Sequence, residues 1–188
     1  MRPYGSGPLA TVGLTLLLAA GWAAPSSAQW TAELRVGSAI GNYTATEAGL
    51  DIVPSLSVAA AVELAFTDLV SGYAGINRSA FGCNQAFCAG RDVSISSRGL
   101  TAGVRLAQGT VWGRAGLAVQ ALRVESDALA ETTDPGIGWE VAAGVDIPVG
   151  RGFRVRPGLT FLRHSASTAD ADGHAALLVL DVGVAMRL

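Results

Sequence analysis

Lysine is absent from this 188-residue chain, so all 13 of its basic side chains apart from histidine are arginines. With 15 acidic residues the formal net charge is −2. A protein that follows a phosphate backbone needs a strongly basic face, so this balance argues against nucleic acid as a partner. Arginine carries a planar fork of donors, and its exclusive use favours paired contacts with carboxylates.

Long apolar runs are also missing, with one exception at residues 8–24. That run follows a single positive charge and precedes small residues, with Ser26 and Ala28 at the −3 and −1 positions of a cleavage site. This order is typical of a secretory signal peptide. We therefore expect a signal peptide at residues 1–28 and one exported domain at 29–188. An uncleaved membrane anchor is the alternative, and the glycines and prolines in the run argue against it.

Cysteine is scarce: Cys83 and Cys88 are the only two. In an exported protein, a pair at this spacing is expected to close a small disulfide ring. A metal site would need more ligands than two thiolates supply, and no histidine lies close by in the sequence. The sequence therefore predicts a disulfide, no metal and no cofactor.

Helical periodicity is lacking after residue 28, whereas apolar residues at every second position recur along the whole domain. This alternation is the signal of a β-strand with one apolar face. It is clearest at the C-terminus, where Leu180, Val182 and Val184 alternate with Asp181 and Gly183. Eight strands are predicted, near residues 30–43, 56–66, 70–81, 100–106, 111–125, 139–147, 153–161 and 178–188.

The connections between these strands alternate strictly in length. Those after the second, fourth and sixth strands are short, at residues 67–69, 107–109 and 149–152. Those after the first, third, fifth and seventh strands are longer and more polar, near residues 44–53, 82–97, 126–136 and 167–174. Short turns on one rim and long loops on the other are typical of transmembrane barrels, whose strands must close into a ring. The predicted fold is an all-β, antiparallel, up-and-down transmembrane barrel of about eight strands.

Charged residues occupy the face of the strands opposite to the apolar one, and that face points inward if the apolar face meets lipid. A barrel of eight strands is only wide enough to be filled by its own side chains, so we expect a paired network and no solute channel. An acid–base site is disfavoured because each carboxylate has an arginine to neutralise it. The predicted interior residues are Glu33, Arg35, Glu63, Arg105, Arg114, Gln120, Glu140, Asp146, Arg154, Arg156, Asp181 and Arg187.

Four arginines fall on the apolar face, each near the loop end of its strand: Arg78, Arg98, Arg123 and Arg163. An arginine that faces lipid costs least near the membrane interface. We expect these side chains to meet lipid phosphates there, whereas simple extension of the side chain toward water is the alternative. Aromatic residues are few, at 6%, and gather near the predicted strand ends. Trp30, Phe66, Trp112 and Phe153 are expected at the turn rim, and Tyr43, Phe81, Trp139 and Phe161 at the loop rim.

With this strand count, loop alternation and terminal strand, residues 30–188 resemble the small outer-membrane barrels that include OmpX, the opacity and attachment-invasion proteins and the membrane domain of OmpA. The resemblance implies a monomeric, non-enzymatic protein of the bacterial outer membrane that serves envelope structure or surface contact through extracellular loops. Outer-membrane lipids are the implied lipid partners, with lipopolysaccharide as one candidate. The terminal strand, residues 176–188, is similar to the signal that the barrel assembly machinery recognises, although it ends in Leu188 where an aromatic residue is typical.

Two other functions are considered. Lipid A deacylases of this architecture carry a His-x-Ser pair late in the chain, and His164 lies in a similar place here. Ser165 and Ser167 are one and three residues away, so on a strand they project to the face opposite His164. The other alternative is a soluble periplasmic barrel that binds a ligand, but such a barrel would bury its apolar face inside.

Overall fold

The computed structural model describes residues 29–43, 54–82, 94–126, 129–167 and 173–188. The predicted signal peptide and the Cys83–Cys88 pair lie outside these residues. Ten strands are present within them, and none of the described residues forms a helix long and apolar enough to cross a membrane. The strands are β1 Trp30–Tyr43, β2 Ser55–Ala65, β3 Val70–Gly82, β4 Ser94–Gln108, β5 Val111–Ser126, β6 Leu129–Thr132, β7 Gly136–Val145, β8 Ile147–Pro148, β9 Phe153–Ser165 and β10 His174–Arg187.

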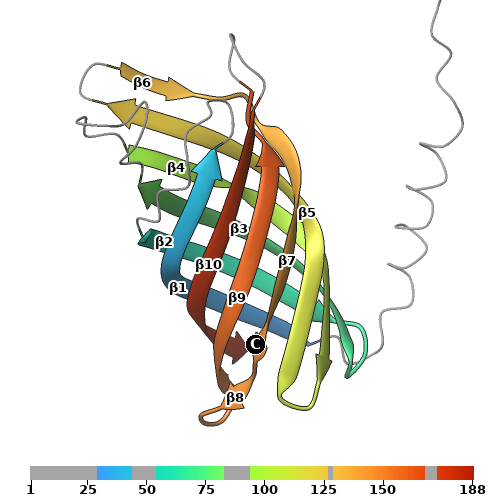
Figure 1. The fold of residues 1–188 in the computed structure, drawn as a ribbon. Coiled ribbons are helices and arrows are strands. Elements are labelled where there is room, and N and C mark those ends of the chain that lie inside the picture. The colour runs from blue at the N-terminus through green and yellow to red at the C-terminus, as the bar shows by residue number, and fades with distance from the viewer. Residues whose placement is uncertain (1–28, 44–53, 83–93, 127–128, 168–172) are drawn as a thin grey trace, which may run out of the picture.

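Eight of these strands form a closed antiparallel barrel (Figure 1). The order is β10-β1-β2-β3-β4-β5-β7-β9, and β9 pairs in turn with β10. The closing ladder of β1 and β10 runs from the Thr31–Arg187 pair to the Tyr43–Ala175 pair. Closure gives every long strand two paired edges, as a barrel in a bilayer requires. The predicted fold class is confirmed.

Three predicted connections differ from the structure. The loop expected near residues 82–97 ends earlier, because β4 already begins at Ser94. The segment expected to be a loop near 126–136 contains β6, which pairs with β5 from Arg123–Thr132 to Ser126–Leu129. Four residues are too few to show a clear alternation, so no strand signal could be recognised there. In addition, β4 continues to Gln108, so the turn that follows it consists of Gly109 and Thr110. Gly109 has a φ of 63°, which glycine adopts without steric cost.

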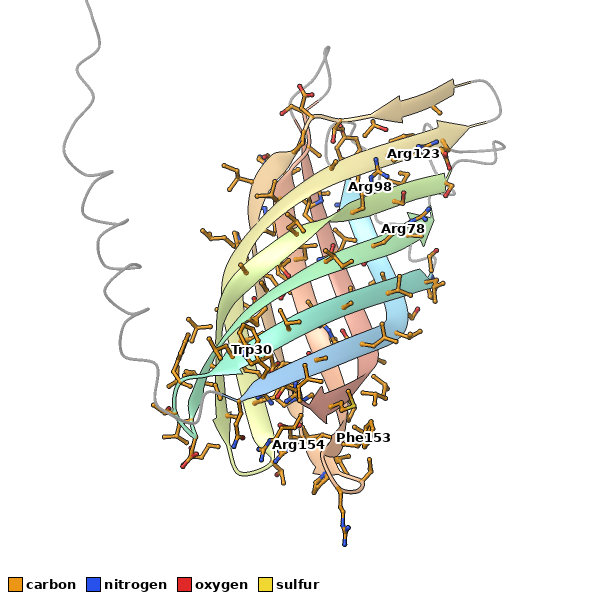
Figure 2. All side chains as sticks on the ribbon, turned by 180° about the vertical axis from the view of Figure 1, so that it is seen from behind. Trp30, Arg78, Arg98, Arg123, Phe153 and Arg154 are labelled. Carbon is orange, nitrogen blue, oxygen red and sulfur yellow. The ribbon has the colours of Figure 1, made fainter. Side chains whose placement is uncertain are left out.

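The barrel has two distinct ends. The turn end carries the three short connections β2–β3, β4–β5 and β8–β9 and the C-terminal end of β10, and the loop end carries β6 and the C-terminal ends of β1 and β3 (Figure 1). Trp30 and Phe153 lie at the turn end, as predicted, and both are about half exposed (Figure 2).

Apolar side chains cover the outside of the barrel. Leu117 is 69% exposed, Leu180 67% and Leu34 60%, and the residues next to them on each strand are buried or partly buried. This is the reverse of a soluble barrel, in which the apolar face would be inside. The alternation therefore produces a surface suited to lipid and an interior lined by polar and charged groups.

Candidate functional site

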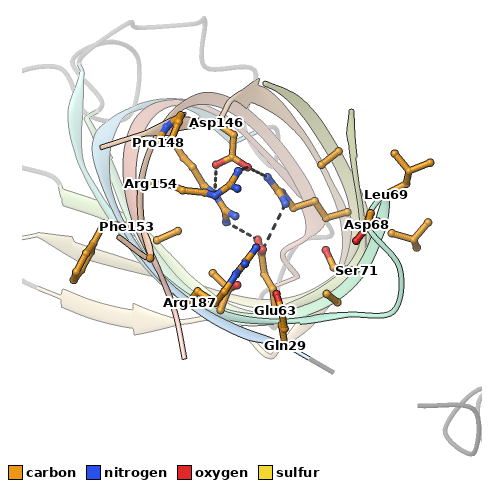
Figure 3. Close-up of a pocket in the computed structure, with 18 of the residues that line it drawn as sticks. Gln29, Glu63, Asp68, Leu69, Ser71, Asp146, Pro148, Phe153, Arg154 and Arg187 are labelled. Atoms are coloured by element: carbon orange, nitrogen blue, oxygen red, sulfur yellow. Dashed lines mark hydrogen bonds and ion pairs between the residues drawn. The ribbon is translucent and has the colours of Figure 1, made fainter. Parts of the chain in front are cut away.

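A layer of ion pairs crosses the interior near the turn end (Figure 3). Arg156 on β9 donates to Glu63 on β2 at 2.9 Å and to Asp146, between β7 and β8, at 2.8 Å. Arg105 on β4 donates to the other oxygen of Asp146 at 2.7 Å. Because β2, β4 and β9 are not neighbours in the sheet, these contacts can only be made across the inside of the barrel.

A second group of ion pairs lies on the same inner faces. Arg114 Nε on β5 is 3.0 Å from Glu140 on β7, and both side chains are almost fully buried. Arg35 on β1 contacts Asp181 on β10 at 3.4 Å. The two groups are linked through Glu33, which lies 3.9 Å from Arg114 and 3.7 Å from Arg156.

The paired charges have two consequences. Each carboxylate in this interior network lies within ion-pair distance of an arginine, so none is available as an isolated acid or base. Among the described residues there is also no group of three side chains that could hold a metal ion. Coulomb attraction in such a network is largely offset by the cost of removing charges from water, yet loss of one partner leaves an uncompensated buried charge.

Two aromatic side chains lie inside the barrel among the arginines. Trp112 is only 3% exposed, so its predicted place in the aromatic rim is wrong. Arg105 and Arg114 lie over its ring, 5.4 and 5.9 Å from the centroid. Tyr73 lies under Arg114 at 5.0 Å and donates its hydroxyl to Glu140 at 3.1 Å. An indole or phenol ring beside a guanidinium group stabilises it by cation–π contact.

Glycines on neighbouring strands make room for these rings. Tyr73, Gly103 and Gly116 are successive register partners on β3, β4 and β5, so the phenol lies over two glycines on its way to Glu140. A Cβ placed on Gly116 would overlap the Tyr73 hydroxyl. In the same way, a Cβ on Gly144 would overlap the Pro157 carbonyl oxygen on β9 and come 2.7 Å from the Trp112 ring. Each ring therefore depends on the absence of a side chain on an adjacent strand.

Toward the loop end the interior becomes apolar. Ile95, Leu122, Leu162 and Leu177 form a buried cluster together with small alanines. Tyr43 packs against this cluster and donates its hydroxyl to the Ala166 carbonyl at 3.2 Å, so this ring points inward. The described part of the interior is thus charged near the turn end and apolar near the loop end.

His164 lies beside this apolar cluster and is 1% exposed. Its Nδ1 lies 2.9 Å from the Ser165 carbonyl, which fixes Nδ1–H as the donor. Nε2 then accepts from the Ser97 hydroxyl at 3.0 Å, and Gln120 Oε1 lies 3.3 Å from the same hydroxyl. Ser165 is on the other face of β9 and donates to the Ile137 carbonyl. The histidine and the serine of the considered deacylase motif therefore point in opposite directions.

Two of the predicted interior arginines lie at the mouth of the turn end rather than in the buried network. A pocket of about 480 Å³ opens there, lined among others by Arg154, Arg187 and Ser71 (Figure 3). Arg154 reaches Asp146 at 3.3 Å but leaves 41% of its side chain exposed. Arg187 is exposed and has no ion-pair partner among the described residues, so the network as described does not include it. The other ten predicted interior residues are all buried.

The four outward arginines do not form one uniform set. Arg78 and Arg98 are direct register partners on β3 and β4, and Arg123 on β5 lies in the adjoining row, opposite Ser96 (Figure 2). Arg123 is paired with Glu125 at 2.5 Å. Arg163 lies apart on β9, opposite Trp139 on β7. In the part of the chain that the structure describes, Arg78, Arg98 and Arg163 are exposed and have no acidic partner.

Tyr73, Trp112, Ser97 and Thr160 are interior residues that the sequence analysis did not select. Three of them occur in step with a selected interior charge on the same strand: Trp112 precedes Arg114 by two residues, Thr160 follows Arg156 by four, and Ser97 precedes Arg105 by eight. Tyr73 lies on β3 at the parity opposite to Arg78, which was assigned to the apolar face. Strand parity could therefore have placed them inside. Their partners could not have been found in this way, since those lie on other strands.

No protein-family model and no curated protein sequence matches the chain. Several solved structures do. Neisserial surface protein A aligns with a TM-score of 0.58 at 15% identity, over 85% of this chain and 97% of that one. Ail, the attachment invasion locus protein of Yersinia pestis, gives 0.51 at 14% identity, over 83% and 98%. A major outer membrane protein from Thermus thermophilus gives 0.52 at 12% identity, over 86% and 100%. The chain has the fold of the small eight-stranded outer-membrane β-barrels.

Proposed function

We propose that this chain is a non-enzymatic protein of the bacterial outer membrane that serves envelope structure or surface contact through its loops, with an interior closed to solutes. The observation that carries this proposal is the combination of an apolar exterior with an interior crossed by its own ion pairs. The exterior needs lipid around it. The charges of the buried network form ion pairs with one another rather than with a ligand.

Closure of the interior is supported at two levels. Near the turn end, Arg156 and Arg105 span the space between β2, β4 and β9 through Glu63 and Asp146. Near the loop end, the apolar cluster around Leu122 and Leu177 fills the same space. A barrel of eight strands has an interior that side chains can fill, so neither level needs a partner to close it. A monomer fits this arrangement.

Two partners belong to the proposal. Outer-membrane lipids, with lipopolysaccharide as one candidate, would contact the apolar exterior and the outward arginines. The barrel assembly machinery would recognise the terminal strand β10, whose outward face carries Leu180, Val182 and Val184. The Cys83–Cys88 disulfide, if formed, would shape one of the surface loops. Contact with molecules outside the membrane would then be made by the loops.

The first test is the location and heat behaviour of the protein. A folded barrel should resist SDS when cold, change mobility on boiling and fractionate with the outer membrane. The purified protein should then give no stepwise ion current when it is added to a planar lipid bilayer. A large porin, added to the same type of bilayer as a positive control, should give such currents. Recovery in the soluble periplasmic fraction without a heat shift would contradict the location, and reproducible unitary currents would contradict the closed interior.

An enzymatic role centred on His164 has a separate test. We expect lipid A from cells that overproduce the protein to have the same mass as lipid A from cells without it. The reason is that His164 is buried and its nearest hydroxyl, on Ser97, is buried with it. Loss of an acyl chain that depended on His164 would replace our proposal with the hydrolase.

A further inference from the structure

The lipid-facing side of the barrel is hollowed over β1 to β5. A groove of about 660 Å³ lies there, between the longer side chains of Ile76, Leu100 and Leu117. The shallow parts of its surface are formed by alanines on the outward face, Ala60, Ala74 and Ala102. Its walls are almost entirely apolar. A volume of this size lies within the range of pockets that hold small molecules.

The Arg78–Arg98 pair lies at the loop end of this groove. Arg78 is two residues beyond Ile76 on β3, and Arg98 is two residues before Leu100 on β4, so each arginine lies next to a groove residue on the same outward face. Direct register partners in an antiparallel ladder have their Cβ atoms only about 4.5–5.5 Å apart. Like charges in such a position repel each other, and neither guanidinium has an acidic partner among the described residues.

We propose that the groove and the Arg78–Arg98 pair together bind one phosphate-bearing lipid of the outer leaflet. The phosphate would lie between the two guanidinium groups, and an acyl chain would fill the groove below them. This inference rests on the proposed membrane location and adds a specific binding site to it. The pair supplies charge complementarity to a phosphate, and forked contacts from two arginines would replace their mutual repulsion with attraction.

Each of the other two outward arginines lacks one requirement of this site, either a guanidinium group without an acidic partner or a position beside the groove. Arg123 is already paired with Glu125. Arg163 is unpaired among the described residues, but it lies beside Trp139 on the far side of β7, away from the groove. The site therefore requires Arg78 and Arg98 in particular, and Arg163 provides a matched arginine at the same end of the barrel.

The test uses purified protein in a neutral detergent, with defined lipids added and the complexes counted by native mass spectrometry. The probes are diphosphoryl lipid A and the same lipid with its phosphates removed. The wild-type protein should bind the phosphorylated probe at least about tenfold more tightly, since charge-assisted contacts are stronger than neutral ones. The double variant R78Q/R98Q should lose this preference, whereas R163Q should keep it.

A second variant tests the groove independently of the charges. Ala74→Leu with Ala102→Leu should fill it, and both probes should then bind about tenfold more weakly while the preference for phosphate persists. These side chains face lipid, so the interior packing is unaffected, and the heat shift in SDS checks folding.

The melting temperature provides a separate test of the arginine pair. Because R78Q/R98Q removes the repulsion between the two guanidinium groups, its melting temperature in neutral detergent should equal or exceed that of the wild type. Diphosphoryl lipid A should then raise the melting temperature of the wild type but not of R78Q/R98Q.

Several outcomes would overturn the site. Equal affinity of the wild type for the two probes would remove the role of the phosphate. An equal loss in R163Q and R78Q/R98Q would show diffuse attraction around the rim. Unchanged binding after the groove is filled would remove the role of the groove. A wild-type protein found outside the outer membrane would instead contradict the proposed function, whatever the lipids do, so the two failures are distinguishable.

Discussion

At the scale of single residues, Arg156 connects more carboxylates than any other interior arginine described. It donates to Glu63 and Asp146 and lies near Glu33. We expect Arg156→Met to lower the free energy of unfolding by about 3–5 kcal/mol, because it leaves these buried carboxylates without a donor. Reversible urea unfolding in neutral lipid vesicles, followed by tryptophan fluorescence, measures this change.

The matched control is Arg123→Met, which breaks an ion pair whose side chains are 39% and 48% exposed. Exposed pairs contribute about 0–1 kcal/mol, so this variant should unfold nearly as the wild type does. If the two variants lost similar amounts of the free energy of unfolding, burial of the ion pair would not determine how much stability its loss removes.

At the scale of elements, the spacing of neighbouring strands depends on glycines that lie under the two interior rings. We expect Gly116→Ala to destabilise the barrel by about 1–3 kcal/mol, because the added methyl group collides with the Ala102 carbonyl oxygen on β4 and with the Tyr73 hydroxyl, which it separates from Glu140. Gly113→Ala on the same strand is the control. A Cβ there meets nothing closer than a carbonyl oxygen at 3.7 Å, so the change should lie within about 0.5 kcal/mol.

A double variant separates the ring from the backbone. In a Tyr73→Phe background the hydroxyl is gone, so Gly116→Ala should cost measurably less than it does in the wild type. Additive losses would show that the methyl group acts on the strand backbone instead of on Tyr73. Both measurements use the same unfolding assay.

At the scale of the whole molecule, the pairing of β1 with β10 closes the ring. Leu188 lies just beyond this ladder, 68% exposed, and its N–H donates to the Trp30 carbonyl at 2.9 Å. An aromatic ring is favoured at this interfacial depth and is typical of the terminal position in similar barrels. We expect Leu188→Phe to raise the heat-shifted fraction in the outer membrane of cells that produce the protein at high level.

Leu180→Phe is the matched control, since Leu180 is 67% exposed on the outward face of the same strand but lies far from its end. It should leave the assembled fraction unchanged. An equal gain in both variants would point to general hydrophobicity rather than to recognition of the terminus.

Much of the fold could be predicted because strand parity is a local property. Asp181 lies between Leu180 and Val182 in the sequence, so it must point away from the face they share, whatever the rest of the chain does. The same argument placed ten of the twelve selected polar residues in the interior. Residue type was the misleading criterion at Trp112, which was assigned to a rim as an aromatic residue although its parity with Arg114 points inward.

The sequence by itself thus determined which side chains share a face, the number of long strands, and an apolar outside with a charged inside. Only the tertiary structure decided which charges meet. Arg156 and Glu63 are 93 residues apart and belong to strands that are not neighbours, so their contact depends on the closure of the whole ring. The juxtaposition of Arg78 and Arg98 beside a groove likewise depends on the β3–β4 register. Alternation is set within a few residues, whereas register and closure are set by the packing of all eight strands together.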